Sequence, residues 1–157
     1  MSKIARASRN ASLMRVETIE ASADGTLAAP TKTIASAETG EIYFIDCSSN
    51  TVSVVLPALK AGAYFKFIIA SAANDEATKD FILYTDSNST DMGGTIVDGG
   101  GLTEITSTTS MITLDSDVLA GGLTTGDFIE CVSDGTSWYV TGVVLGAAGI
   151  VIADNRS

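Results

Sequence analysis

The sequence predicts an all-β protein: a single-domain, jelly-roll-like β-sandwich or small barrel preceded by an extended N-terminal arm. Short runs of β-branched and aromatic residues recur along the chain, separated by turn-forming clusters of Gly, Ser, Asn and Asp. Apolar and polar residues alternate in several runs, as in strands with one buried face. No stretch carries a convincing amphipathic helical pattern. A chain of 157 residues is long enough for one domain with a real core.

Two regions of different character divide the chain. Residues 1–37 are expected to form a basic arm and connector, and residues 38–157 the β domain. The first region is rich in Ser, Ala, Thr and Gly and has no clean period. Within it, residues 10–19 fit either a short helix or an extended strip. Asp24-Gly25 marks a turn, and Ala28-Ala29-Pro30 indicates an extended connector, because the residue before proline avoids the helical region.

Strand-forming runs follow in quick succession from residue 40. They share a high content of Val, Ile, Phe, Tyr and Thr, and the turn clusters between them contain Gly, Asn or Pro. The runs are residues 41–47, 51–56, 63–70, 81–85, 95–97, 102–106, 110–115 and 126–142, with a last short strand within 146–153. In the third run we assign Phe65, Phe67 and Ile69 to the core, since successive side chains of a strand alternate between its two faces.

Residues 126–142 predict a β-hairpin. Two strand-forming stretches flank Asp134-Gly135, a dipeptide that suits a two-residue type I′ turn. With that turn Cys131 lies opposite Trp138, and Ile129 lies opposite Val140, on one wholly apolar face that should be core. A longer loop from Ser133 to Thr136 is the alternative, with a different register near the turn.

The opposite face of this hairpin is mixed. It carries Phe128, Glu130 and Tyr139, with Glu130 expected opposite Tyr139. A mixed face is typical of a surface that is partly wet or meets another subunit. These three residues are therefore the candidate subunit-interface residues.

Charge is strongly segregated along the chain. Residues 1–15 hold Lys3, Arg6, Arg9 and Arg15 and no acid, so they sum to +4. The remaining residues have 5 basic against 19 acidic side chains, which gives −14. An acidic body repels nucleic acid, so we expect no nucleic-acid partner. The four basic residues are candidates for docking onto an acidic partner surface, and a solvated tail is the alternative.

The residues that most enzymes and metal sites need are missing or poorly arranged. The chain contains no His, no Cys-x-x-Cys and no Walker loop, which argues against His-based catalysis, zinc and nucleotide binding. Asp86-x-Asn88-x-x-Asp91 and Asp115-x-Asp117 have a calcium-like composition but match no full loop consensus, and solvated loop acids are the better interpretation. We therefore expect no enzyme, no metal and no cofactor.

Two further catalytic or covalent possibilities are disfavoured. A pair of acids for glycoside hydrolysis would have only Trp138 as a sugar platform. Cys47 and Cys131 lie in apolar strand patterns and are expected to be buried free thiols, which suits folding in a reducing cytoplasm. No apolar run reaches eighteen residues, and the basic start lacks an apolar segment after it, so neither a membrane span nor a secretory signal is expected.

Three segments together resemble a recurring pattern in small β-rich virion proteins of tailed phages. The first, Thr51-Val-Ser-Val-Val-Leu-Pro-Ala58, is similar to a strand that ends in Leu-Pro. The second, Gly62-Ala-Tyr-Phe-Lys-Phe-Ile-Ile69, is similar to the aromatic strand that follows it. The third joins Gly126-Asp-Phe-Ile-Glu130 to Ser133-Asp-Gly-Thr-Ser-Trp-Tyr-Val-Thr-Gly142. The resemblance spans roughly residues 40–145.

This resemblance implies a structural role. The family includes capsid decoration (cement) proteins and domains of fibres or tail appendages, and it has no active site. It implies a homotrimer that binds the major capsid protein and stabilises the phage head, located in the virion and made in the host cytoplasm. The alternative is a tail fibre or appendage domain that binds a host-surface receptor or glycan. The absence of a long shaft favours the decoration protein, with no membrane or nucleic-acid partner.

Overall fold

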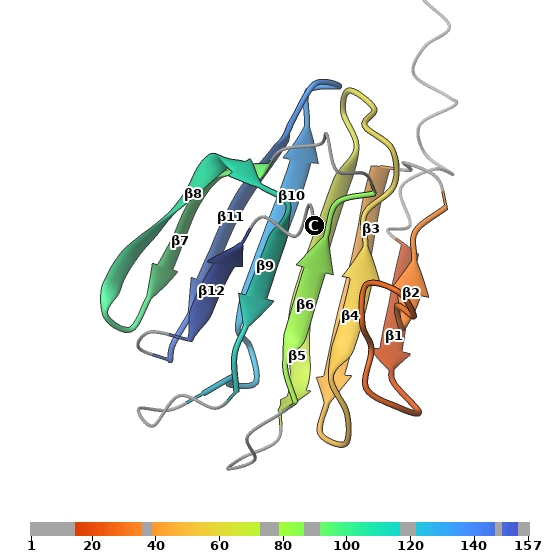
Figure 1. Ribbon diagram of the computed structural model, residues 1–157, viewed down its shortest axis with the longest axis vertical. Helices are drawn as coiled ribbons and strands as arrows, with labels where there is room; N and C mark the ends of the chain where they lie inside the picture. The colour runs from red at the N-terminus through yellow and green to blue at the C-terminus, as the bar shows by residue number, and fades with distance from the viewer. Residues whose placement is uncertain are drawn as a thin grey trace, which may run out of the picture.

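The computed structural model describes residues 15–35, 39–72, 79–86, 92–116, 122–146 and 149–153. In these residues the protein is all-β, as expected, with two mixed sheets stacked face to face and the core between them (Figure 1). Sheet A has seven strands in the order β1-β3-β5-β10-β11-β7-β8. Sheet B has five strands in the order β12-β9-β6-β4-β2.

The strand bounds follow the predicted runs closely from residue 39 onwards. Sheet A contains β1 (Arg15–Glu20), β3 (Thr39–Cys47), β5 (Tyr64–Ala72), β7 (Met92–Asp98), β8 (Gly101–Thr109), β10 (Phe128–Ser133) and β11 (Trp138–Val144). Sheet B contains β2 (Lys32–Thr33), β4 (Val52–Val55), β6 (Phe81–Tyr84), β9 (Met111–Leu114) and β12 (Ile150–Ala153). The strands are between two and nine residues long, and all but the two-residue β2 are within the usual range.

The first six strands form a flattened parallel coil. The chain alternates between the sheets, so that β1, β3 and β5 are parallel neighbours in sheet A while β2, β4 and β6 are parallel neighbours in sheet B. Arg15 lies opposite Glu41, which lies opposite Phe65. This connectivity differs from the jelly roll expected from the sequence, because a jelly roll is built from antiparallel strands.

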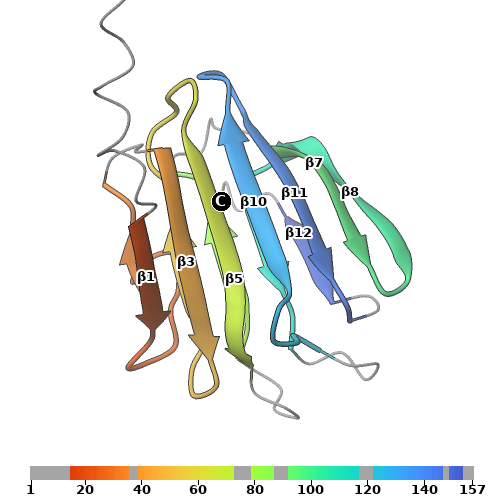
Figure 2. The same ribbon diagram turned by 180° about the vertical axis from the view of Figure 1, so that it is seen from behind.

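The second half of the chain closes the two layers with mostly antiparallel strands. β9 pairs antiparallel with β6, and β10 with β5, while β12 forms the edge of sheet B beside β9. The β10–β11 and β7–β8 hairpins extend sheet A, joined through the parallel pair β11 and β7. Seen from behind, sheet A presents its broad outer face from β1 to β8 (Figure 2).

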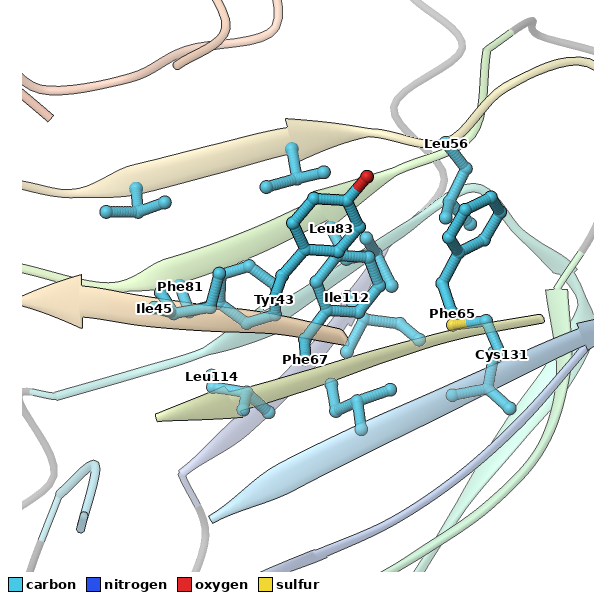
Figure 3. Packing of buried hydrophobic residues seen from close by; sticks show 14 of the residues in the cluster. Tyr43, Ile45, Leu56, Phe65, Phe67, Phe81, Leu83, Ile112, Leu114 and Cys131 are labelled. Atoms are coloured by element: carbon cyan, nitrogen blue, oxygen red, sulfur yellow. The ribbon is translucent and has the colours of Figure 1, made fainter. Parts of the chain in front are cut away.

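Aromatic side chains from both sheets fill the centre of the core (Figure 3). Tyr43 on β3 stacks on Phe67 on β5 with ring centroids 5.4 Å apart. Phe67 in turn meets Phe81 of sheet B at 5.5 Å, so the rings bridge the two layers. Phe65, Phe67 and Ile69 are almost completely buried, which confirms the core face predicted for this strand.

The pairing of the N-terminal residues with the β body was not expected. β1 and β2 pair with β3 and β4, so residues 15–35 are part of the β body, whereas the sequence placed them in an arm and connector that end at residue 37. Residues 15–19 are extended rather than helical. Of β1 only Ile19 is buried, because this edge strand has little core to cover. Residues 10–14 lie outside the described residues.

The β10–β11 hairpin has the predicted faces but a different register. Ser133 pairs with Trp138 and Cys131 with Val140, which leaves a four-residue loop at 134–137. The two-residue turn was therefore wrong. A shift of two residues keeps every side chain on its own face, so the predicted core residues of the hairpin are all fully buried.

The side chain of Asp134 explains the longer loop. Its Oδ1 accepts the backbone N–H groups of Thr136 at 2.7 Å and Ser137 at 2.9 Å, and also the Thr136 hydroxyl at 2.7 Å. Such a side-chain-to-backbone network competes with a tight two-residue turn. These bonds to the charged carboxylate, first that of the Thr136 hydroxyl, lower the pKa of Asp134 to about 2.

Asp127 stabilises the other end of the same hairpin through hydrogen bonds. Its carboxylate is buried and accepts the N–H of Thr124 at 2.8 Å and the N–H of Leu145 at 3.0 Å. Its carbonyl oxygen accepts the N–H of Ile69 on β5 at 2.8 Å. Asp127 therefore joins the start of this hairpin to β5 and to the residue that follows β11.

Candidate interaction face

The outer face of sheet A carries an apolar row that crosses six strands. Strand pairing places its members side by side in the order Phe44, Ile68, Phe128, Val143, Val97 and Leu102. Phe44, Ile68 and Phe128 are half-buried, whereas Val97 is 46% exposed and Leu102 74% exposed. The row faces away from the core and is most exposed at its β7–β8 end. Contiguous exposed apolar surface is a mark of binding sites.

Two more rows run parallel to it across the strands. The polar row contains Lys66, Glu130, Thr141, Thr95 and Glu104 on β5, β10, β11, β7 and β8. The aromatic row contains Tyr64, Val132 and Tyr139 on β5, β10 and β11. Val132 and Tyr139 are 45% and 53% exposed. The polar row therefore lies between the apolar row and the aromatic row.

An ion pair lies at the centre of this face. The Nζ of Lys66 is 2.6 Å from the Oε1 of Glu130 and 4.2 Å from the ring centroid of Phe128. The cation is thus held both by a carboxylate and by an aromatic face. Burial, and after it the charge of Glu130, raises the pKa of Tyr64. One group of contacts therefore links members of all three rows.

The three predicted interface residues lie together on this face. Phe128 belongs to the apolar row, Glu130 to the polar row and Tyr139 to the aromatic row. Tyr139 lies opposite Val132 rather than Glu130, and its hydroxyl donates to the Oδ2 of Asp134 at 3.0 Å. Their contact with another subunit remains a prediction.

Sequence reasoning missed most of the other members of the rows. Because Phe65, Phe67 and Ile69 are assigned to the core, alternation within residues 63–70 places Lys66 and Ile68 on the opposite face. Their neighbours on other strands follow only from long-range pairing, such as β5 with β10. No local pattern specifies that pairing.

Of the four predicted arm residues, only Arg15 lies within the described residues. It is the first residue of β1, and its Nη1 is 3.3 Å from the Oε1 of Glu41. The Glu41 carboxylate is buried and also accepts a hydrogen bond from the hydroxyl group of Tyr43. Arg15 therefore contacts its own β body. Lys3, Arg6 and Arg9 lie outside the described residues.

A charged pocket lies beside these residues, where β1 and β2 form the end of the coil. It has a volume of about 180 Å³, and its lining includes Arg15, Glu17, Lys32 and Glu41. The Nζ of Lys32 is 2.7 Å from the Oε1 of Glu17. Each of these four charged side chains is thus paired with another, and the Lys32–Glu17 pair joins β2 of sheet B to β1 of sheet A.

The two cysteines and the calcium-like acidic residues were also singled out from the sequence. Cys47 and Cys131 are free, buried thiols, and burial raises the pKa of Cys47 to about 12. No group of three or more His, Cys, Asp or Glu side chains is placed to hold a metal within the described part of the chain. The calcium-like residues Asn88, Asp91 and Asp117 lie outside it.

Comparisons with known proteins give no match to a family model, a curated protein or a solved structure. Among the residues that the structure describes, none forms an apolar helix of the length that a membrane span requires.

Proposed function

We propose that this protein is a structural virion protein, a capsid decoration protein that binds a tailed-phage head as a homotrimer and stabilises it. The sequence resemblance to small β-rich virion proteins gives the class. The observation that carries the proposal is the outer face of sheet A, where the apolar row and the aromatic row lie on either side of the Lys66–Glu130 ion pair. A broad sheet face whose central charges neutralise each other suits assembly more than catalysis.

Stabilisation would work by mass action. A protein that binds the assembled head, and not its separated subunits, adds its binding free energy to that of the shell. A small β domain with a well-packed aromatic core suits this role, because it presents a preorganised surface and loses little entropy on binding. The partner in this proposal is the major capsid protein.

The basic segment is the proposed contact with the capsid. Lys3, Arg6 and Arg9 supply positive charge ahead of an acidic body, so they suit an acidic groove on the shell. Arg15 is assigned a different role, because its guanidinium is paired with Glu41. A test of the arm should therefore remove residues 1–14 and leave β1 intact.

The experiment uses heads of the parent phage purified without this chain. Added protein should cosediment with the heads and raise the temperature at which they release DNA. Deleting residues 1–14, or changing Lys3, Arg6 and Arg9 to Gln, should abolish cosedimentation while the circular dichroism spectrum stays unchanged. Lys60→Gln, an exposed charge on the body, is the matched control. Unchanged binding by the deletion variant would refute the arm.

The alternative role, an appendage domain that binds a host receptor or glycan, gives a different result in the same assay. The protein would then cosediment with tails or with host cells and leave the heat stability of heads unchanged. Head binding without any stabilisation would likewise count against a decoration role.

A further inference from the structure

We propose that the outer face of sheet A is the contact between copies of this chain. In this arrangement three copies surround an axis that runs parallel to the strands, and the Lys66–Glu130 pair fixes their relative height. The number three rests on the proposed function. The contact surface and its register rest on the rows of side chains described above.

The charge distribution favours another copy as the partner. Residues 16–157 carry a net charge of −14, so copies of the body repel each other over most of their surface. The charged side chains in the three rows are Lys66, Glu130 and Glu104, and the first two neutralise each other at 2.6 Å. Two acidic bodies can therefore approach each other through these rows with little charge repulsion. A basic partner would instead be attracted to the acidic remainder.

The direction of the rows favours rotation about an axis along the strands. Such a rotation keeps every residue at its own height, so the apolar row of one copy meets the apolar row of the next, and the polar rows likewise meet. Six strands spaced at about 4.8 Å make the face about 24 Å wide, and the outermost of the three rows are about 14 Å apart. This is the scale of the largest patches found on monomers, which are often functional.

The ion pair gives the arrangement its register. Each copy presents Lys66 and Glu130 in the same order around the axis, so positive and negative charges alternate around the trimer. A slip of two residues along the strands would place these charges against the apolar row of the neighbour. A buried charge without a partner is strongly unfavourable, so the slip is opposed. Lys66 and Glu130 are thus specificity-determining residues.

The first test replaces one valine with glutamate on each outer surface of the molecule. Val97 in the apolar row and Val151 on β12 of sheet B are 46% and 44% exposed, so Val97→Glu and Val151→Glu are matched in chemistry and exposure. Sedimentation equilibrium over a range of concentrations measures the assembly. We expect a trimer for wild type and Val151→Glu, and a monomer for Val97→Glu with an unchanged circular dichroism spectrum.

The second test addresses the ion pair. Lys66→Met and Glu130→Leu each leave one charge without its partner and should weaken assembly at least tenfold. The double variant removes both charges, and it should assemble as tightly as wild type but form a mixture of oligomers, because the register is no longer fixed. Single variants that assemble like wild type would overturn the register role.

Two outcomes overturn the contact itself. These are a wild-type protein that is not a trimer and a Val97→Glu variant that still forms one. A wild-type protein that is not a trimer would also contradict the homotrimer in the proposed function, but neither outcome bears on head binding itself, which a monomer can also perform. Conversely, a trimer that depends on Val97 but does not bind heads would overturn the proposed function and leave this inference intact.

Discussion

Gly94→Ala is expected to destabilise the protein severely, because β7 and β11 approach each other too closely for a side chain. Gly94 pairs with Val140 in the parallel β11–β7 ladder. A Cβ built on Gly94 would lie 1.9 Å from the carbonyl oxygen of Val140 and 2.9 Å from its carbonyl carbon. The backbone also has φ +148°, a conformation that L side chains rarely adopt. Steric overlap with backbone cannot be relieved by rotating a side chain.

The magnitude follows from two contributions. A non-glycine residue in this region of φ costs about 1–3 kcal/mol. Moving β7 away from Val140 weakens ladder hydrogen bonds worth about 1 kcal/mol each. Together these give about 3–5 kcal/mol, a large part of the 5–15 kcal/mol typical of a folded domain. At about 2–4 °C per kcal/mol for a chain of this size, the melting temperature should fall by about 6–20 °C.

The assay is thermal and urea unfolding followed by circular dichroism, with Gly93→Ala as the control. A Cβ on Gly93 would meet the carbonyl oxygen of Ile105 at 3.9 Å, an ordinary contact. That variant should stay within about 0.5 kcal/mol of wild type. The reasoning is refuted if Gly94→Ala melts within about 2 °C of wild type, a shift that corresponds to about 1 kcal/mol or less.

Three other changes probe the hairpin and the core. Asp127→Ala should lower the free energy of unfolding by about 2–4 kcal/mol in urea, because it removes the buried carboxylate that accepts the N–H groups of Thr124 and Leu145; equal stability would show that these bonds contribute nothing. The pKa of Asp134 is lower in the folded than in the unfolded state, so its stabilisation is present above about pH 4 and lost as the pH falls towards 2. Asp134→Ala should therefore lose less stability than wild type between those pH values, and parallel acid profiles would contradict this. Cys47 and Cys131 should react with a thiol reagent only after denaturation, since both are buried with raised pKa values, and fast labelling of the native protein would be the opposing result.

The strands that cover the core could be predicted from the sequence, and their partners could not. The run of aromatic and β-branched residues around Phe65, Phe67 and Ile69 identifies a strand, and their alternation identifies its buried face, without knowledge of what lies beside it. The parallel coil depends on pairing such as Arg15 with Glu41, between segments far apart in the chain. No turn signature marks such pairs, so a jelly roll and a coil give the same local pattern.

Edge strands and the hairpin register show where local reasoning fails. β1 has alternating residues but buries only Ile19, so its apolar signal is weaker than that of a central strand. The dipeptide Asp134-Gly135 suits a two-residue turn, but the bonds accepted by the Asp134 carboxylate stabilise four loop residues instead. The predicted face survived because a two-residue shift preserves alternation.

Alternation along the strands also predicted part of the candidate face. Phe128, Glu130 and Tyr139 lie on it because they alternate with buried residues of the hairpin. Lys66, which completes the central ion pair, comes from β5 and is brought beside Glu130 only by the antiparallel β5–β10 pairing. A surface assembled from six strands is a property of the tertiary structure. The sequence of one strand identifies only the residues that this strand contributes to the surface.

The number of copies of this chain in purified phage particles tests the central claim most directly. Quantitative mass spectrometry against the major capsid protein gives that number. A decoration protein should be present in hundreds of copies, in a fixed ratio to the capsid protein, and should remain with the heads after tails are removed. A handful of copies that leave with the tails, or none at all, would contradict the proposed role.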